Sequence, residues 1–236
     1  MVKLDFGEYR KDDIERRLQK ANFRPLDMMV TGVTGAGKST TLNALFQKGV
    51  AKVGNGVEPE TMKLGSYRLN DAFRVWDTPG LGDGVARDQI HKEKIKELLR
   101  KTFSLDGNNY GLIDMVMVII EGANRDMGTT YTLLNEVIVP NIQEDRILVV
   151  INQADMAMKG RHWRSADRTP DPYLKEFLEE QSHSVQKRVK EATGVTILKP
   201  VYYSAEYGYN LKAVFDFIVD NMPVRRRPLV KNNSCF

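Results

Sequence analysis

Residues 32–39 read Gly-Val-Thr-Gly-Ala-Gly-Lys-Ser, which is the pattern G-x-x-x-x-G-K-[ST] of a phosphate-binding loop. Glycines allow successive backbone N–H groups to converge on one anion, and the start of the following helix favours negative charge. Lys38 adds a positive charge near the β- and γ-phosphates of a nucleotide, and the hydroxyl of Ser39 is a ligand for Mg²⁺. The apolar run 28–30 and the helix-like run 41–46 supply the flanking strand and helix that a glycine-rich turn without a ligand would not need.

Three further polar motifs each follow a predicted strand, where open α/β sheets bind their ligands. In Asp77-Thr78-Pro79-Gly80, a carboxylate can hold Mg²⁺ and a glycine lets its own N–H approach a γ-phosphate. Asn152-Gln153-Ala154-Asp155 and Ser204-Ala205 come later in the chain. The carboxylate of Asp155 can accept hydrogen bonds from N1–H and the exocyclic amine of guanine, whereas adenine offers no such pair of donors. Taken alone, the last two motifs are also compatible with ordinary turn chemistry.

The elements that must position these motifs alternate along the chain. Their pattern predicts one α/β domain with helices on both faces of a mainly parallel sheet. The runs 115–120 and 147–151 are apolar throughout, which is typical of central strands buried on both faces, and Asn70-Asp71 predicts a hairpin. The expected strands are 28–33, 64–69, 73–76, 115–120, 147–151 and 201–203, and the expected helices are 8–22, 38–46, 86–102, 129–139, 172–192 and 211–221.

Composition sets limits on the kind of protein. The chain has 236 residues, 42% hydrophobic and 28% charged, which is ordinary for a soluble protein with a sizeable core. No run approaches the about eighteen apolar residues of a membrane span, and the first residues lack an apolar signal stretch, so we expect a cytoplasmic protein. The net charge of +4 lies after Asp220, in Arg225, Arg226, Arg227 and Lys231. This basic tail could contact RNA, a ribosome or an anionic surface, or simply be solvated.

Taken in order, the four motifs resemble the signature motifs of the translation-factor-related GTPases, and among these the Era/TrmE-like G domains. The loop G-x-T-G-A-G-K-S-T and the segment D-T-P-G-L-G-D also resemble those of immunity-associated and interferon-inducible GTPases. The resemblance implies a three-layer P-loop GTPase fold, with a mostly parallel sheet of about six strands and one antiparallel hairpin strand. We expect a helical extension over 1–24, a G domain over 25–222 and a basic, disordered tail over 223–236.

The same resemblance implies a Mg²⁺-dependent GTPase that converts GTP to GDP and phosphate, and it assigns roles to particular residues. Lys38, Thr61 and Gly80 would be catalytic, and Ser39, Thr61 and Asp77 would hold Mg²⁺. Thr61 is the one hydroxyl residue within 42–63, although it could also be an ordinary surface residue. The residues expected to bind GTP or GDP are Gly32, Thr34, Gly35, Ala36, Gly37, Lys38, Ser39, Thr40, Asn152, Gln153, Asp155, Ser204 and Ala205.

Three positions depart from the familiar pattern. Leu81 stands where Ras-like GTPases place the glutamine that orients the attacking water, and leucine cannot do that. Gly35 occupies the position of the asparagine in the potassium-dependent TrmE-like mechanism, which argues against that route. We therefore expect slow intrinsic hydrolysis, stimulated by a homodimer through the switch face or by another partner. Gln153 replaces the usual lysine of N-K-x-D, so guanine preference should survive with weaker affinity.

Two other functions are compatible with parts of the sequence. A GTP-dependent binding or assembly module with negligible turnover would explain Leu81 and Gly35. A P-loop kinase or ATPase would require the Asn152–Asp155 and Ser204-Ala205 motifs to be coincidental. Two insertions, 82–111 and 156–172, border the expected site, and Trp163 in the second could either face a partner or pack on the domain. His91 and His162 are expected to face solvent.

Overall fold

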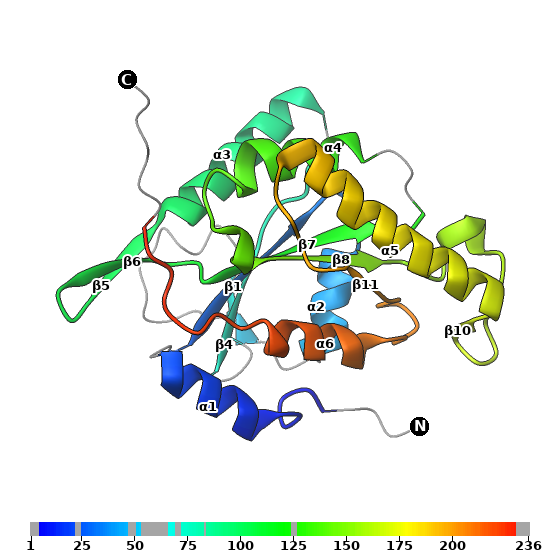
Figure 1. The fold of residues 1–236 in the computed structure, drawn as a ribbon, viewed down its shortest axis with the longest axis horizontal. Helices are drawn as coiled ribbons and strands as arrows, with labels where there is room; N and C mark the ends of the chain where they lie inside the picture. The colour runs from blue at the N-terminus through cyan, green and yellow to red at the C-terminus, as the bar shows by residue number, and fades with distance from the viewer. Residues whose placement is uncertain are drawn as a thin grey trace.

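A seven-stranded sheet lies between two layers of helices in the computed structural model, which confirms the predicted α/β fold (Figure 1). The structure describes residues 5–21, 25–46, 51–52, 66–68, 72–82, 84–123 and 127–229. The sheet has one strand more than the six expected. Its strands, in spatial order, are β11 (Val201–Tyr202), β8 (Ile147–Asn152), β7 (Met115–Glu121), β1 (Leu26–Gly32), β4 (Phe73–Asp77), β3 (Ser66–Arg68) and β2 (Ala51–Lys52).

Strand direction divides this sheet into two parts. Neighbours from β11 to β4 are parallel, whereas β3 is antiparallel to β4 and β2 is antiparallel to β3. The predicted antiparallel hairpin of β3 and β4 is therefore confirmed, although its Asn70-Asp71 turn lies outside the described residues. Because the five parallel strands end at the same edge, the loops that follow β1, β4, β8 and β11 meet there.

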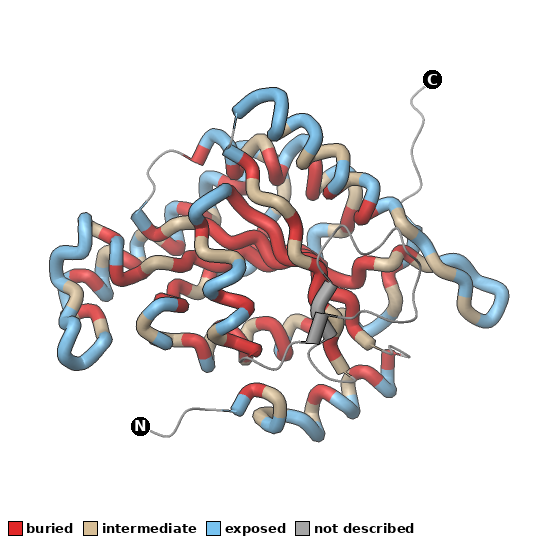
Figure 2. The backbone as a smooth tube through the Cα atoms, turned by 180° about the vertical axis from the view of Figure 1, so that it is seen from behind, coloured by how far each residue is buried: buried red, intermediate tan, exposed pale blue. Residues whose placement is uncertain are grey.

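Alternation along the central strands gives each helical layer its own core. In β1, Met28 and Val30 face one hydrophobic cluster, and Met29 faces the other. The helices α1 (Lys11–Ala21), α2 (Lys38–Phe46) and α6 (Leu211–Asp220) cover the first face. The second face is covered by α3 (Val85–Arg100), α4 (Gly128–Leu133) with the π-helical turn Leu134–Ile138, and α5 (Pro172–Thr193). Figure 2 shows the buried strands between these layers. None of the described helices is long and apolar enough to cross a membrane.

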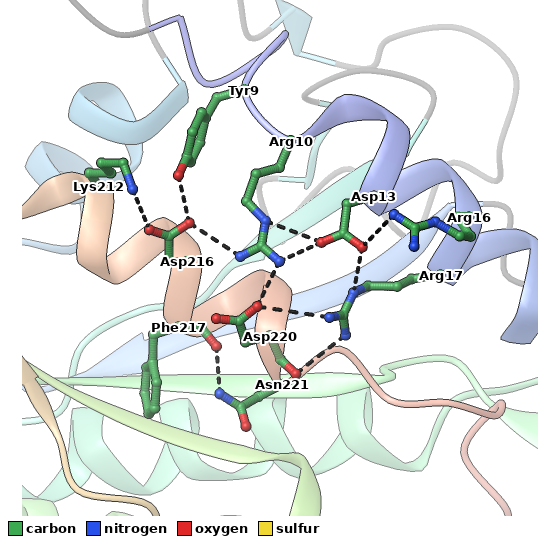
Figure 3. A network of polar contacts seen from close by, with 10 residues as sticks. All are labelled: Tyr9, Arg10, Asp13, Arg16, Arg17, Lys212, Asp216, Phe217, Asp220 and Asn221. Carbon is green, nitrogen blue, oxygen red and sulfur yellow. Dashed lines mark hydrogen bonds and ion pairs between the residues drawn. The ribbon is translucent and has the colours of Figure 1, made fainter.

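The N-terminal helix α1 packs onto the domain rather than standing apart. Ile14, Leu18 and Ala21 share the hydrophobic cluster that also holds Phe215 of α6. Charged groups close the edge of this contact, where Arg10 donates to Asp216 and Asp220 at 3.2 and 2.6 Å (Figure 3). The narrow apolar stripe of this helix therefore serves intramolecular packing.

Two hairpins within the insertions were not predicted. β5 (Thr102–Leu105) and β6 (Asn108–Gly111) project from the domain beside the end of α3 (Figure 1). Asp106 and Gly107 connect them with φ angles of 51° and 75°, the conformation of a type I′ turn, so the Asp-Gly pair was a usable signal. The second insertion contains the 3₁₀ turn Ala157–Gly160 and the short strands β9 (Trp163–Arg164) and β10 (Thr169–Pro170).

Residues 223–229, here called the C-terminal strap, lie against the end of α3. Arg227 is only 3% exposed and donates to the carbonyls of Leu99 and Asn141 at 2.5 and 2.9 Å. Its own carbonyl accepts from the N–H of Gly111 at 3.0 Å. Burial lowers the pKa of Arg227 to about 10. The expectation of a disordered tail is therefore wrong for 223–229, while 230–236 lie outside the described residues.

Replacing Arg227 by alanine should destabilise the domain, because two carbonyl groups would lose a buried charged donor. We expect a loss of about 2–3 kcal/mol in the free energy of unfolding, measured by urea denaturation. Arg225→Ala is the matched control, because the Arg225 side chain is exposed and only its carbonyl accepts a bond from Arg146. This control should stay within about 0.5 kcal/mol of wild type. Equal effects of the two substitutions would contradict the structural role of the strap.

Candidate functional site

The phosphate-binding loop connects β1 to α2 at the carboxyl edge of the sheet. Thr34, Gly35, Ser39 and Thr40 are exposed there, so a ligand can reach these positions of the loop. Gly37 has a φ of +81°, and a Cβ atom at this position would lie 2.3 Å from Nδ2 of Asn152. Only glycine therefore allows the loop to approach the base motif this closely.

The Lys38 side chain folds back along the phosphate-binding loop. Its Nζ donates to the carbonyls of Gly32 and Val33 at 3.3 and 3.0 Å. It also lies close to Gly80, where an added Cβ would be 2.8 Å from Nζ. This places the lysine charge between the loop and the segment expected to sense the γ-phosphate.

Asn152 at the end of β8 joins the loop to the strand-end motif after β11. Its Nδ2 donates to the carbonyl of Ala36 at 2.9 Å, and its Oδ1 accepts from the N–H of Ala205 at 3.0 Å. The side chain is 2% exposed, so both bonds are sheltered from water. Gln153 adds a parallel contact, because its Nε2 donates to the carbonyl of Gly35 at 2.8 Å. The structure thus brings the phosphate, Asn152–Asp155 and Ser204-Ala205 motifs together as expected.

A buried tyrosine directly after β11 also fixes the position of the loop that follows this strand. Tyr203 is fully buried, and its hydroxyl is 2.7 Å from Oγ1 of Thr41, which itself contacts the carbonyl of Gly37 at 2.8 Å. Burial raises the pKa of Tyr203, so its phenol keeps the hydrogen that this bond requires. Ser204 is buried, and its hydroxyl accepts from the N–H of Tyr207 at 3.2 Å. Ser204 therefore shapes its own loop, and the backbone N–H of Ala205 already has a partner in this structure.

Among the residues that the structure describes, two carboxylate groups at the site contain a buried oxygen without a hydrogen-bond partner. One is Oδ1 of Asp155, a residue that is 8% exposed, and the other is Oδ1 of Asp77. Burial raises the pKa of Asp77, while the nearby charge of Lys38 acts in the opposite direction. A buried carboxylate oxygen is stable when a donor or a cation meets it. Asp155 therefore suits a ligand with N–H groups, and Asp77 together with the hydroxyl of Ser39 suits a hard cation such as Mg²⁺.

The segment after Asp77, residues 78–82 and here called the switch segment, is attached to the phosphate-binding loop. The N–H of Thr34 donates to the carbonyl of Leu81 at 2.7 Å, and Thr78 donates through Oγ1 to the carbonyl of Val30 at 3.0 Å. Leu81 is fully buried within the hydrophobic cluster that includes Ile95 of α3. Its side chain is thus part of the hydrophobic core.

Sequence reasoning missed two polar side chains that hold this segment. His91 was expected to face solvent, yet it is half-buried and its Nδ1 lies 2.7 Å from the carbonyl oxygen of Gly80. Asp88 assists on the other side of Leu81, because its Oδ1 accepts from the N–H of Gly82 at 2.9 Å. No sequence motif predicts these contacts, because they depend on the direction of α3 relative to the switch segment that precedes it.

The remaining predicted features have mixed outcomes. Thr61 lies outside the described residues, so its roles as a metal ligand and a catalytic residue stay predictions. Trp163 packs against the rings of Tyr207 and Tyr209, with centroid distances of 5.3 and 5.6 Å. The second insertion therefore supports the loop after β11 instead of presenting this tryptophan to a partner. His162 is exposed as expected and lies 2.8 Å from Asp171.

Comparisons with known proteins agree with this geometry. Translocase of chloroplast 132 from Arabidopsis thaliana is 27% identical over 211 residues, which are 83% of this chain and 16% of that protein. The uncharacterized protein YkfA from Escherichia coli K12 is 29% identical over 150 residues, or 61% of this chain and 47% of that protein. The chain thus spans less than half the length of these relatives.

Solved structures support the same fold. Toc33 from Arabidopsis thaliana in complex with GDP and Mg²⁺ superposes with a TM-score of 0.61 at 16% identity, covering 94% of both chains. A GTP-binding protein from Sulfolobus solfataricus in complex with GDP gives a TM-score of 0.52 at 19% identity, covering 91% of this chain and 58% of that one. The family model described as "50S ribosome-binding GTPase" matches residues 27–186, about two thirds of the chain. With its four motifs gathered at one edge of the sheet, the chain belongs to this GTPase family.

Proposed function

We propose that this chain binds guanine nucleotide at the carboxyl edge of the sheet and hydrolyses GTP to GDP and phosphate, slowly on its own. The observation that carries the proposal is the buried Oδ1 of Asp155, which has no hydrogen-bond partner among the described residues. Guanine presents N1–H and an exocyclic amine, and a carboxylate can accept both. Adenine has no N1–H, so it would leave the buried oxygen unsatisfied at a cost of several kcal/mol.

The phosphate side of the proposal rests on the loop and its lysine. The exposed backbone of the loop and the start of α2 would hold the α- and β-phosphates, with Thr40 near the α-phosphate. Lys38 and the N–H of Gly80 would meet the γ-phosphate, since the two lie side by side. Asp77, Ser39 and, outside the described residues, Thr61 would hold Mg²⁺, which neutralises phosphate charge when bound.

Slow intrinsic hydrolysis is supported by the place of Leu81. Because this side chain is fully buried in the core, the position cannot supply a water-orienting group in this backbone conformation. The missing group would then come from a second copy across the switch face or from another partner. The same observation favours a second candidate function, in which GTP serves as an assembly ligand with negligible turnover.

Other partners stay predictions at the level of the sequence. The basic tail is expected to meet RNA, a ribosome or an anionic surface, but Arg227 is buried and Lys231 lies outside the described residues. The proposal therefore places the activating partner at the switch segment, and contact of the basic tail with RNA, a ribosome or an anionic surface stays a prediction.

Nucleotide selectivity tests the base site directly. We expect calorimetry to give the affinity order GDP above IDP above ADP, because IDP keeps N1–H but lacks the exocyclic amine. A site whose buried carboxylate needs N–H donors from the base should bind GDP roughly 10⁴-fold more tightly than ADP, and the affinity for IDP should lie between the two. Asp155→Ala should abolish most of this discrimination. Equal binding of GDP and ADP by the wild-type protein would refute the proposal.

Turnover as a function of protein concentration separates the two candidate functions. If a second copy completes the site, phosphate release per molecule should rise as the protein concentration is raised at saturating GTP and Mg²⁺. A constant, low rate at all concentrations, with GTP bound, would favour the assembly ligand or a different partner. Fast turnover by dilute monomer would contradict the argument from Leu81. Lys38→Ala provides the background rate, since it removes the phosphate-binding charge.

A further inference from the structure

Helix α3 reaches back over the segment that precedes it. The helix begins at Val85, and His91 lies about two turns along it, on the side that faces the switch segment. The 2.7 Å contact joins its Nδ1 to the carbonyl oxygen of Gly80, eleven residues earlier. Neither the four motifs nor the proposed function uses this contact.

The chemistry of the contact fixes the state of the imidazole ring. A carbonyl oxygen can only accept a hydrogen bond, so Nδ1 of His91 must carry the hydrogen. In the neutral ring, Nε2 is then the nitrogen without hydrogen. The contact is half-buried, which shelters it from competing water and makes it more effective than a bond on an open surface.

The peptide group between Gly80 and Leu81 is consequently held at both ends. Its oxygen accepts from His91, and its N–H points to the carbonyl of Gly32 at 3.4 Å. The latter bond is long and weak, which leaves His91 as the stronger of the two restraints. The adjacent peptide, which carries the N–H of Gly80, can turn only about the two dihedral angles of that glycine.

This restraint acts where a γ-phosphate would be recognised. Gly80 lies so close to the loop that an added Cβ would be 2.6 Å from Oγ1 of Thr34 and 2.8 Å from Nζ of Lys38. An N–H group that is already in place loses little conformational entropy when a phosphate oxygen binds it. GDP lacks the γ-phosphate and gains nothing from the same arrangement.

We infer that His91 is a positioning residue for GTP: its Nδ1–H holds the carbonyl of Gly80 so that the N–H of Gly80 meets the γ-phosphate. The inference rests on the proposed function and deepens it, because it names a side chain that raises the affinity for GTP relative to that for GDP. His91 contacts neither nucleotide itself. It acts through the glycine, and it links the switch segment to α3.

The test compares the affinity for GMPPNP with that for GDP in four proteins: wild type, His91→Ala, His91→Asn and His183→Ala. Asparagine keeps an N–H donor near the place of Nδ1, and His183 is a matched control because it is exposed on α5. Kd values are measured by calorimetry in Mg²⁺ buffer, and the melting temperature of each protein is recorded.

His91→Ala should weaken GMPPNP binding about fivefold, the effect of one ordinary hydrogen bond, and leave the Kd for GDP within about twofold. His91→Asn should recover most of the GMPPNP affinity, and His183→Ala should match wild type. An unchanged ratio of the two Kd values, or an equal loss for both nucleotides, would overturn the inference. If the wild type binds neither nucleotide, the proposed function itself fails, which is a different outcome.

A second measurement keeps the inference testable if His91→Ala does not fold. Nitrogen-15 NMR of the histidine rings in the wild-type protein reports which ring nitrogen carries hydrogen. We expect a protonated Nδ1 on His91 in the GMPPNP complex, with slower exchange of that hydrogen than in the GDP complex. A ring protonated only at Nε2 in the GMPPNP complex would overturn the inference, because it could not donate to Gly80.

Discussion

One amide side chain holds the nucleotide end of this molecule together. Asn152 donates to the carbonyl of Ala36 and accepts from the N–H of Ala205, so the loop after β1 and the loop after β11 are both attached to the end of β8. An amide can donate and accept at the same time, whereas a carboxylate or an ammonium group at this buried position could make only one of these two bonds. The Asn152 side chain also lies so close to the phosphate-binding loop that a Cβ atom at position 37 would meet its Nδ2, which explains why position 37 must be glycine.

The two hydrophobic clusters give this site a rigid base. Strands buried on both faces send successive side chains into opposite helical layers, so the positions of the strand ends are fixed by packing on each side. Polar groups are then added only at the edge, where the chain leaves the sheet. Leu81 shows how closely the core and the polar edge meet, because it directly follows Gly80 and yet belongs to the hydrophobic core beneath α3.

Much of this arrangement could be predicted from the sequence. An uninterrupted apolar run such as 115–120 is typical of a strand buried on both faces, so the central parallel strands and the motifs at their ends could be placed. His91 was missed because its contact depends on the direction of α3, which no local pattern encodes. Arg227 was missed for a different reason: a cluster of arginines is usually solvated, and its burial depends on carbonyl groups at Leu99 and Asn141 that are remote in sequence.

The capping of α3 by the C-terminal strap has a mechanical consequence. His91, about two turns into this helix, contacts Gly80 beside the phosphate-binding loop, and the carboxyl end of the helix at Leu99 is bonded to Arg227. A displacement of the helix along its axis would therefore pull on the strap, and a force applied to the strap would act on the helix. α3 therefore links the segment beside the phosphate-binding loop to the C-terminal strap.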